Sequence, residues 1–542
     1  MILIMLWTVV WGAAAVGLGR LVRAPSPSDL RIAISGFVGL LAMAVVAMWA
    51  SIFGPVGDLP ALAVLGAGLL GFGIEARQFA ASNRLFLVAL LVAVAALSAL
   101  GQIPGLFGDQ GLYYLQAVEW MKGPDAALGI ANLHGRLGFN SSWFAIAALI
   151  EIPPLRGRSS FVLSILPIVF AIAALLGAVN LLRKGTWSRD VVYLAAVAVP
   201  SCFACRTLGS MSPDGPVWIL TFLSAALWST AFARRAQFEA FATAASLFSV
   251  LALTIKPSAL PLAAGSAILL SWQRAAVGRR RLLWIAGVSA AAVVPWGLRG
   301  LMTSGCLLYP VPQSCVGALP WAVTRADAQL MQDWIASWAR RPLLEPSRVL
   351  GDWRWLGPWA LRSIQEGAFV GALSFLSGGL ASLGRSIRSL DASFWAPFAL
   401  SLGAVGFWFV SAPDPRFAVG ALFALALLPV AAAISRHASE GPAGSRFRRR
   451  VMRLSFLGCA LILAAANPWI VQLRSPGKFS ATRWPELPQP AVRARTTVGG
   501  GVLNVPVGTD QCWRAPLPCA PDGTPGLSLR GPFALASASS PR

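Results

Sequence analysis

The sequence predicts an all-α protein that crosses a membrane many times. Of its 542 residues 56% are hydrophobic and only 12% are charged, whereas about a quarter of a typical soluble chain is charged. Apolar runs of roughly 20 residues, the length of a membrane-spanning helix, recur from Met1 to Val471. A transmembrane β-barrel would instead need segments of about ten residues that alternate in polarity. Because Leu85–Leu100 is apolar on every face, the pattern favours helices.

Short basic clusters between the apolar runs predict the direction of each span, because Lys and Arg accumulate at cytoplasmic helix ends. The clusters are Arg20/Arg23, Arg77/Arg84, Arg183/Lys184, Arg234/Arg235, Arg279–Arg281, Arg385/Arg388 and Arg446–Arg453. They fit about fourteen spans at 1–19, 31–52, 60–76, 85–103, 159–182, 189–208, 214–233, 237–255, 258–272, 282–298, 367–384, 392–411, 417–435 and 454–473, with both termini outside. The net charge of +23 therefore reflects topology and does not indicate nucleic acid as a partner.

Two further segments affect this path. Met1–Gly19 has no basic region before it, so we expect a retained first span and not a cleaved signal peptide. Ser142–Ile152 is too short to span and ends at Pro153-Pro154, so we expect it to lie along the outer surface as an interfacial or re-entrant helix.

The resulting organisation has four parts. Residues 1–103 form N-terminal spans, 104–158 an outer loop, 159–473 a helical core with a second outer loop at 299–366, and 474–542 an outer tail. The tail is rich in Pro and Gly and contains β-type patches such as Val502–Val507, which predicts a small β-containing appendage. Cys306/Cys315 and Cys512/Cys519 fall in outer segments at separations that a disulfide can close, so both pairs are predicted disulfides.

The most unusual segment is 108–144, which concentrates polar and ionisable residues between apolar flanks. Leu112, Leu115, Val118 and Met121 recur at three-residue steps and predict an amphipathic helix that lies on the membrane surface. Tyr113 and Tyr114 suit the membrane interface and are candidate substrate contacts.

Asp109 stands at the start of this helix and has two interpretations. Its carboxylate can cap the free N–H groups of the helix and complement the positive end of the helix dipole. Alternatively, a carboxylate at the mouth of a membrane cavity can act as a general base that takes a proton from an acceptor hydroxyl or amine.

Polar donors follow in the same loop and would suit a phosphate or a sugar. Arg136 offers a forked donor, Asn140 neutral hydrogen bonds, and His134 a donor or an acceptor near neutral pH. The alternatives are that Arg136 meets lipid headgroups and that His134 is a structural hydrogen bonder. Since His134 and His437 are the two histidines of the chain, no zinc site can be drawn.

Three further charges stand at predicted outer helix ends. Asp214, in Ser-Pro-Asp-Gly-Pro, opens a span where a carboxylate is favourable as a cap. Arg416, in Pro-Asp-Pro-Arg-Phe, stands in the first turn of another span, where the helix dipole disfavours a cation. We therefore expect Arg416 to bind an anionic partner. Lys256 occupies an outer hinge, where either snorkelling or pairing with a phosphate would explain it.

These residues resemble the multispanning glycosyltransferases of the C superfold, which use polyprenyl-phosphate-linked sugars. The likeness lies in Gly108-Asp109-Gln110 just after a span, the surface-lying helices that follow, and the late turn Pro413-Asp-Pro-Arg-Phe. More narrowly, Gly111-Leu-Tyr-Tyr-Leu-Gln with Asn132-Leu-His-Gly-Arg-Leu-Gly-Phe-Asn-Ser-Ser resembles a group of uncharacterised bacterial membrane proteins near that superfold.

The resemblance implies that Asp109 is the catalytic base and that Arg136, Lys256 and Arg416 bind the donor phosphate. It implies a membrane-embedded enzyme that moves a sugar to a lipid, glycan or protein acceptor at the outer face of a bacterial inner membrane. Two departures are Gln110, where many members carry a second acidic residue, and four spans before the acidic loop where members usually have one. A divalent metal is left open, because these enzymes differ in metal dependence.

Two other classes of function are compatible with the sequence. A transporter or flippase for a lipid-linked or anionic solute would use the same cations along a path, although charges in the middle of spans are few. A non-enzymatic component of an envelope glycan assembly would present the tail to a partner. The enzyme is favoured because the chemically rich residues gather on one predicted face.

Overall fold

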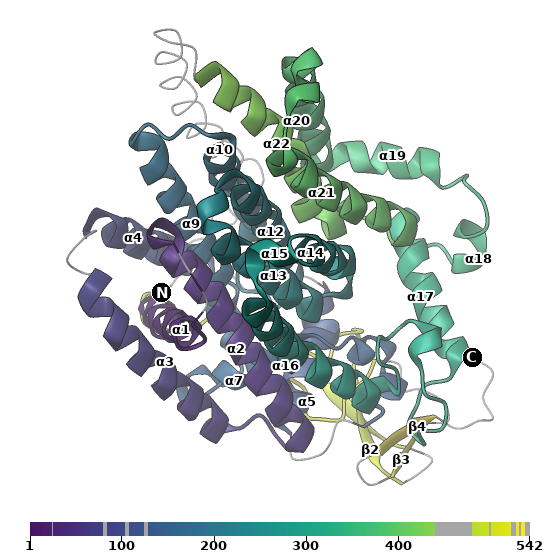
Figure 1. The fold of residues 1–542 in the computed structure, drawn as a ribbon. Coiled ribbons are helices and arrows are strands. Elements are labelled where there is room, and N and C mark those ends of the chain that lie inside the picture. Colours follow the sequence, from purple (N-terminus) through teal and green to yellow (C-terminus); the bar gives the residue numbers. More distant parts are fainter. Residues whose placement is uncertain are drawn as a thin grey trace.

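We describe the fold from a computed structural model of the chain, drawn in Figure 1. The structure describes residues 1–542 except 24, 26, 80–83, 103–107, 124–127, 439–479, 498–499, 522–526, 531–532 and 537–542. Most of the described chain is helical, and the strands are short and confined to the C-terminal tail. The chain is therefore a helical protein with many apolar spans, as the composition predicts.

The helices follow the predicted order along the chain. They are α1 Ile2–Leu21, α2 Arg31–Phe53, α3 Asp58–Phe79, α4 Arg84–Leu100, α5 Leu115–Lys122, α6 Ile130–Leu133, α7 Ser142–Ile150, α8 Ser159–Leu163, α9 Leu166–Arg183, α10 Arg189–Ala195, α11 Ala198–Ala204, α12 Asp214–Ala233, α13 Phe238–Ile255, α14 Leu260–Trp272, α15 Arg274–Val277, α16 Arg279–Ser304, α17 Arg325–Arg340, α18 Pro346–Val349, α19 Leu356–Gln365, α20 Gly367–Leu383, α21 Ala392–Ser411 and α22 Pro415–Ala438.

Among the described residues, ten helical segments are long and apolar enough to cross a membrane. Three shorter apolar helices, Asp58–Ile74, Arg84–Leu100 and Pro257–Trp272, coincide with three more predicted spans. The remaining predicted span, 454–473, lies outside the described residues. The multispanning helical class is thus established, while the count of fourteen spans stays a prediction.

The helices sort their charged residues to two ends of the bundle. The basic end carries Arg183, Lys184, Arg234, Arg235 and Arg279–Arg281. Ion pairs at this end join different helices. Arg234 Nε lies 2.7 Å from Asp190 Oδ2, and Arg281 Nε lies 2.7 Å from Glu239 Oε1. The opposite end, here called the site end, carries Asp109, Asp214, Lys256 and Arg416. This alternation of helix ends is the one that the basic clusters predict.

Helix α7 corrects the prediction that Ser142–Ile152 lies along the outer surface. Its nine residues are all buried, and it packs against α2 and α5 inside the protein. The buried Glu151 ends it, pairing with Lys122 Nζ at 2.6 Å and accepting a hydrogen bond from Ser159 Oγ at 2.7 Å. Because protein surrounds the apolar side chains, α7 is a short enclosed helix, closer to the re-entrant alternative than to an interfacial one.

Glycines let the N-terminal helices approach closely. A Cβ at Gly39 of α2 would overlap the carbonyl oxygen of Ala15 in α1, and one at Gly17 of α1 would overlap that of Gly68 in α3. Small residues at such crossings allow the backbone-to-backbone packing that drives association of membrane helices. The contact between α1, α2 and α3 therefore depends on these positions.

We expect Gly39→Val to lower the free energy of unfolding by at least ~1–3 kcal/mol, because overpacking forces the two backbones apart. The matched control is Gly73→Val in α3, where a Cβ would meet no atom within 4 Å. Denaturant unfolding in detergent, followed by tryptophan fluorescence, measures both. Equal losses of stability in the two variants would contradict this account of the crossing.

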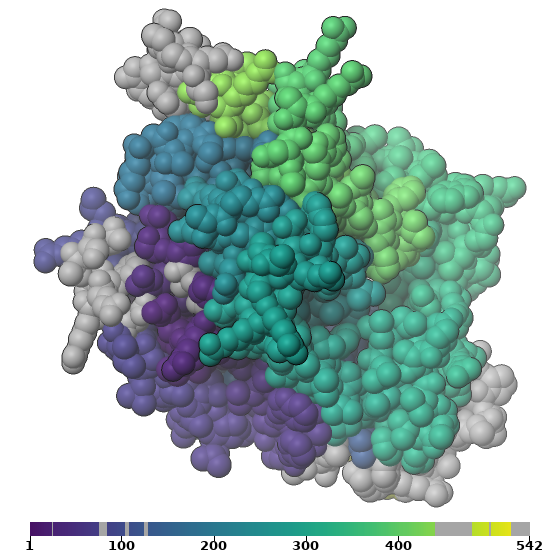
Figure 2. All heavy atoms as spheres, in the orientation of Figure 1, coloured from purple at the N-terminus to yellow at the C-terminus, as the bar shows by residue number. Residues whose placement is uncertain are grey.

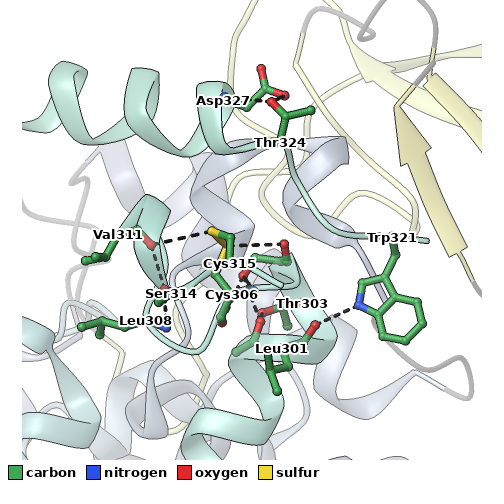
Figure 3. Close-up of a disulfide and its surroundings, with 12 residues drawn as sticks. Leu301, Thr303, Cys306, Leu308, Val311, Ser314, Cys315, Trp321, Thr324 and Asp327 are labelled. Atoms are coloured by element: carbon green, nitrogen blue, oxygen red, sulfur yellow. Dashed lines mark hydrogen bonds between the residues drawn. A yellow bond between two sulfur atoms is a disulfide. The ribbon is translucent and has the colours of Figure 1, made fainter. Parts of the chain in front are cut away.

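The second long loop, after α16, is tied at its start by the disulfide Cys306–Cys315 (Figure 3). Trp321 Nε1 donates to the Leu301 carbonyl at 2.8 Å, and Thr324 Oγ1 caps α17 by accepting from Asp327 N at 3.0 Å. In the sphere view of Figure 2, the stretch from about residue 300 to residue 410 forms one flank of the molecule. The loop is therefore a structured extension of the bundle.

The tail is more integrated than the predicted appendage. Strand β1 (Val492–Thr496) pairs antiparallel with β2 (Val502–Pro506), and β3 (Leu527–Arg530) with β4 (Phe533–Ala536). Figure 1 shows the strands at the lower edge of the molecule, away from α10 and α20 at the top. Ser480 O accepts from the N-terminal amine at 2.7 Å, and Ser480 N donates to Gln102 Oε1 at 3.0 Å. The tail thus lies against the site end of the bundle.

Candidate functional site

Five charged side chains from separate parts of the sequence meet at the site end. Asp109 immediately precedes the π-helical turn Gln110–Tyr114, and Arg136 lies in the 3-10 helix Gly135–Gly138 that follows α6. Asp214 is the first residue of α12, Lys256 follows the end of α13, and Arg416 lies in the first turn of α22. The structure therefore brings together five of the predicted site residues.

The cluster is joined by ion pairs that alternate in sign. Arg136 pairs with Asp109, and Lys256 pairs with Asp214. Arg416 bridges the two carboxylates, with Nη2 at 3.8 Å from Asp109 Oδ2 and Nε at 3.4 Å from Asp214 Oδ2. Three cations and two carboxylates leave one net positive charge, so the cluster as a whole favours an anion.

Burial within the cluster is graded. The Asp214 side chain is 5% exposed, that of Asp109 19% and that of Arg416 40%. Asp214 is therefore an interior anchor that fixes the two cations beside it, whereas Asp109 and Arg416 are open to a solute. A ligand that approaches from outside would meet these two side chains and Arg136 first.

Asp109 does not serve as a helix cap. Its carboxylate makes no capping hydrogen bond, and both of its oxygens face arginines. The neighbouring Gln110 holds the segment in place, because its buried Oε1 accepts from Ser210 Oγ at 3.1 Å and Met211 N at 2.7 Å. The resemblance leads one to expect a second acidic residue at position 110. This chain has the neutral Gln110 there, and its side chain binds the turn before α12.

Tryptophans hold the turn that presents Arg416. Indole N–H groups donate to three carbonyls of this turn, from Trp359 to Pro413, from Trp408 to Asp414 at 2.7 Å and from Trp218 to Arg416 at 2.8 Å. The three indoles come from α19, α21 and α12. Sequence reasoning missed these residues, because an apolar span containing Trp looks the same whether or not its N–H groups bind a turn.

Phe417 links the charged cluster to an apolar groove. Lys256 Nζ lies 4.0 Å from the centre of the Phe417 ring, and Arg416 Cζ lies 5.1 Å from it. Phe417 also lines a small groove of about 50 Å³ between α12, α14, α21 and α22. Apolar and small residues dominate its wall, among them Trp218, Leu262, Ala404, Trp408 and Ala421. The charged cluster and the apolar groove therefore meet at Phe417.

Tyr113 and Tyr114 form an aromatic cluster with Phe144 next to the site. Both are buried, and their rings pack on each other at 4.5 Å and on Phe144 at 6.2 and 5.4 Å. Burial raises the pKa of both phenols well above the ordinary value, so they are neutral and act as hydrogen-bonding and apolar groups. Arg136 lies 5.9 Å from the centre of the Tyr113 ring, which supports its guanidinium.

Asn140 and His134 lie apart from the ion pairs. Asn140 and Trp296 bond each other reciprocally, with the Trp296 indole donating to the Asn140 carbonyl at 2.9 Å, which ties the loop to α16. His134 is largely buried, and its Nδ1 has no hydrogen-bond partner among the described residues. Among the described residues, neither side chain forms a hydrogen bond or ion pair with the charged cluster. Their roles as substrate ligands therefore stay predictions.

His134 makes stability depend on pH. Burial, and secondarily the charge of Arg136, lowers the pKa of His134 from 6.5 to about 4. Between these values the unfolded chain binds a proton that the folded protein does not. We therefore expect this contribution to the free energy of unfolding to be fully present above pH 6.5. It should be lost progressively, by up to about 3 kcal/mol, as the pH falls toward 4.

Denaturant unfolding between pH 4 and 7.5 measures this dependence, and His134→Gln should flatten it. The matched variant is His437→Gln, which removes the other, exposed histidine of the chain and should leave the slope intact. A slope that survives in His134→Gln would assign the effect to other groups.

The described residues contain no group of three or more His, Cys, Asp and Glu that could hold a metal ion. Both predicted cysteine pairs are joined in the structure, as Cys306–Cys315 and Cys512–Cys519. Cys202 and Cys205 are buried within the bundle and take no part in either disulfide. Disulfide-bonded loops thus occur at the site end, where the charged cluster also lies.

Fold and site together define a helical membrane protein with many spans and an ionic cluster at one end. The family model described as "Domain of unknown function (DUF8201)" matches residues 1–423, and the chain belongs to this family. No curated protein and no solved structure matches the chain. All five charged residues of the cluster lie within the matched range.

Proposed function

We propose that this protein is a glycosyltransferase that moves a sugar from a polyprenyl-phosphate-linked donor to a lipid, glycan or protein acceptor. The observation that carries the proposal is the continuity between the charged cluster and the apolar groove at Phe417. A lipid-linked phosphate is an anion joined to a long apolar chain, so its two halves match these two surfaces. The resemblance to the C superfold supplies the reaction.

In the proposed reaction, Asp109 takes the proton of an acceptor hydroxyl or amine as that group attacks the anomeric carbon of the donor sugar. The bond between the anomeric carbon and the phosphate oxygen breaks, and its electron pair leaves with the polyprenyl phosphate. One bond forms and one breaks at the same carbon, with inversion. Arg136, Lys256 and Arg416 offset the charge on the departing phosphate.

Pairing within the cluster couples donor binding to the base. Arg136 and Arg416 both engage the carboxylate of Asp109. A donor phosphate competes for the same guanidinium groups, because arginine binds phosphate oxygens with charge-assisted hydrogen bonds. In the proposed order of events, donor binding draws the arginines away and leaves Asp109 able to accept a proton.

The groove is proposed to contact the first isoprene unit of the donor. Helices α14 and α21 form part of its wall and carry the exposed apolar side chains Leu260 and Leu402, so we propose that the lipid chain enters on this side. The basic end is proposed to face the cytoplasm and the site end the outside of a bacterial inner membrane, with fourteen spans and both termini outside.

The test is to incubate purified protein with a polyprenyl-phosphate sugar labelled in the sugar. Transfer to an acceptor, or hydrolysis by water, removes label from the polyprenyl phosphate. The rival proposal of a transporter or flippase predicts that label moves with the intact lipid. A non-enzymatic assembly component predicts neither result.

A further inference from the structure

The disulfide-closed loop Cys512–Cys519 lies directly on the segment that carries Asp109. Trp513 N donates to the carbonyl of Gly111 at 2.8 Å, two residues beyond Asp109. In return, Gln116 Nε2 donates to the carbonyls of Trp513 at 3.0 Å and Ala515 at 3.1 Å. Because Gln116 is 1% exposed, these hydrogen bonds are shielded from water.

Shape reinforces the contact. A Cβ at Gly111 would overlap the side chains of Gln511 and Trp513, so the absence of a side chain at 111 lets the loop sit against the helix. Arg514 occupies the space over Gly157, and its Nη2 lies 3.3 Å from Glu119 Oε1. The loop thus touches the Asp109 segment along its length, from Gly111 to Glu119.

Contacts with β2 and the disulfide also hold the loop, independently of the helix. Cys512 and Cys519 are buried, and Asn504 of β2 donates through Nδ2 to the Pro516 carbonyl at 2.9 Å. Backbone bonds join Asn504 N to Pro518 O at 2.9 Å and Ala520 N to Asn504 O at 3.2 Å. A disulfide that closes this short loop restricts the conformations it can take, so its carbonyls are held ready for Gln116.

We propose that this loop is a positioning element of the site, which sets the place of Asp109 relative to Arg136 and Arg416. Gln110 ties one side of the segment to the turn before α12, and the loop covers another side. Residues 511–520 lie beyond the range 1–423 that the family model matches. A tail outside the matched part of the chain thus completes the support of a site inside it.

The effect on transfer rests on the proposed function, but the contact is tested independently by hydrogen exchange of the full-length protein in lipid nanodiscs. Gly111→Ala, which places a Cβ against Trp513, should speed exchange of the amides in residues 110–122 at least tenfold. Gly108→Ala is the matched control, because its Cβ would lie 3.9 Å from Gln511 Nε2, an ordinary contact. Exchange in α12 and α22 should stay unchanged in both variants.

A second variant, Cys512→Ser with Cys519→Ser, opens the loop without changing the helix, and it should reproduce the faster exchange of 110–122. Combined with Gly111→Ala it should add little, because both changes break one contact. Cys306→Ser with Cys315→Ser removes the other disulfide and should leave 110–122 protected. Unchanged exchange in both the Gly111 and the Cys512/Cys519 variants would overturn the proposal.

Transfer kinetics separate positioning from loss of folding. Both loop variants should lower kcat at least tenfold and change KM for the donor less than threefold, since Arg416 and Lys256 keep their places. A change confined to KM would contradict the positioning role. If the wild-type protein transfers no sugar, the exchange results still decide whether the loop holds the segment.

Discussion

Replacing Asp109 by Asn should lower the rate of sugar transfer by about 100- to 10,000-fold, the usual contribution of a positioned general base. The amide has nearly the same size but cannot take the acceptor proton. The substitution also removes one negative charge from the cluster. Its net charge becomes more positive, so binding of a polyprenyl phosphate should not weaken. Initial rates at saturating donor, with binding measured separately, distinguish these effects.

Asp352→Asn is the matched control for Asp109→Asn. Asp352 is a carboxylate of the second long loop that is 54% exposed and pairs with Arg354, so its loss should leave the rate unchanged. Wild-type turnover in folded Asp109→Asn protein would remove Asp109 from the chemistry. Equal losses in both variants would point to a general effect of charge.

The second large effect concerns Arg416, which bridges both carboxylates of the cluster. Arg416→Gln should weaken binding of polyprenyl phosphate by about 10- to 100-fold, because a hydrogen bond to a charged group contributes about 1.5–3 kcal/mol. Arg416→Lys should lose part of this affinity, since an ammonium lacks the fork of the guanidinium. Titration of protein in nanodiscs, followed by native mass spectrometry, measures the affinities.

Two controls accompany this titration. Arg354→Gln removes an arginine that is 92% exposed and should leave affinity unchanged. Polyprenol, which lacks the phosphate, should bind Arg416→Gln and the wild-type protein equally. If Arg416→Gln lost affinity for polyprenol to the same extent, the residue would support the groove and not the phosphate.

The spans were predictable because the signal for a membrane helix is continuous and strong. Hydropathy located the helices from Ile2–Leu21 to Pro415–Ala438, and the basic clusters sorted their ends. Ser142–Ile150 was placed wrongly, because an apolar segment of this length reads the same at a lipid interface and inside a protein. Which of the two holds depends on α2 and α5, and no local pattern contains that information.

Part of the site was also predictable from local physics. Arg416 stands where a helix dipole disfavours a cation, and it does have the anionic partners that this placement requires. Its pairing with Asp109, more than 300 positions earlier in the chain, could not be read from either segment. The same holds for Gln110, for the indole donors around the turn and for the tail loop, since each is an ordinary residue whose role depends on a distant partner.

The central claim is that a lipid-phosphate-linked sugar is cleaved at the cluster of Asp109, Asp214, Arg136, Lys256 and Arg416. The most direct measurement follows the release of radiolabelled sugar from a polyprenyl-phosphate donor by purified protein in nanodiscs, alongside Asp109→Asn. The account predicts that label leaves the polyprenyl phosphate with wild-type protein and stays on it with the variant. Label that remains on intact lipid for every donor tried, in protein that binds polyprenyl phosphate, would contradict it.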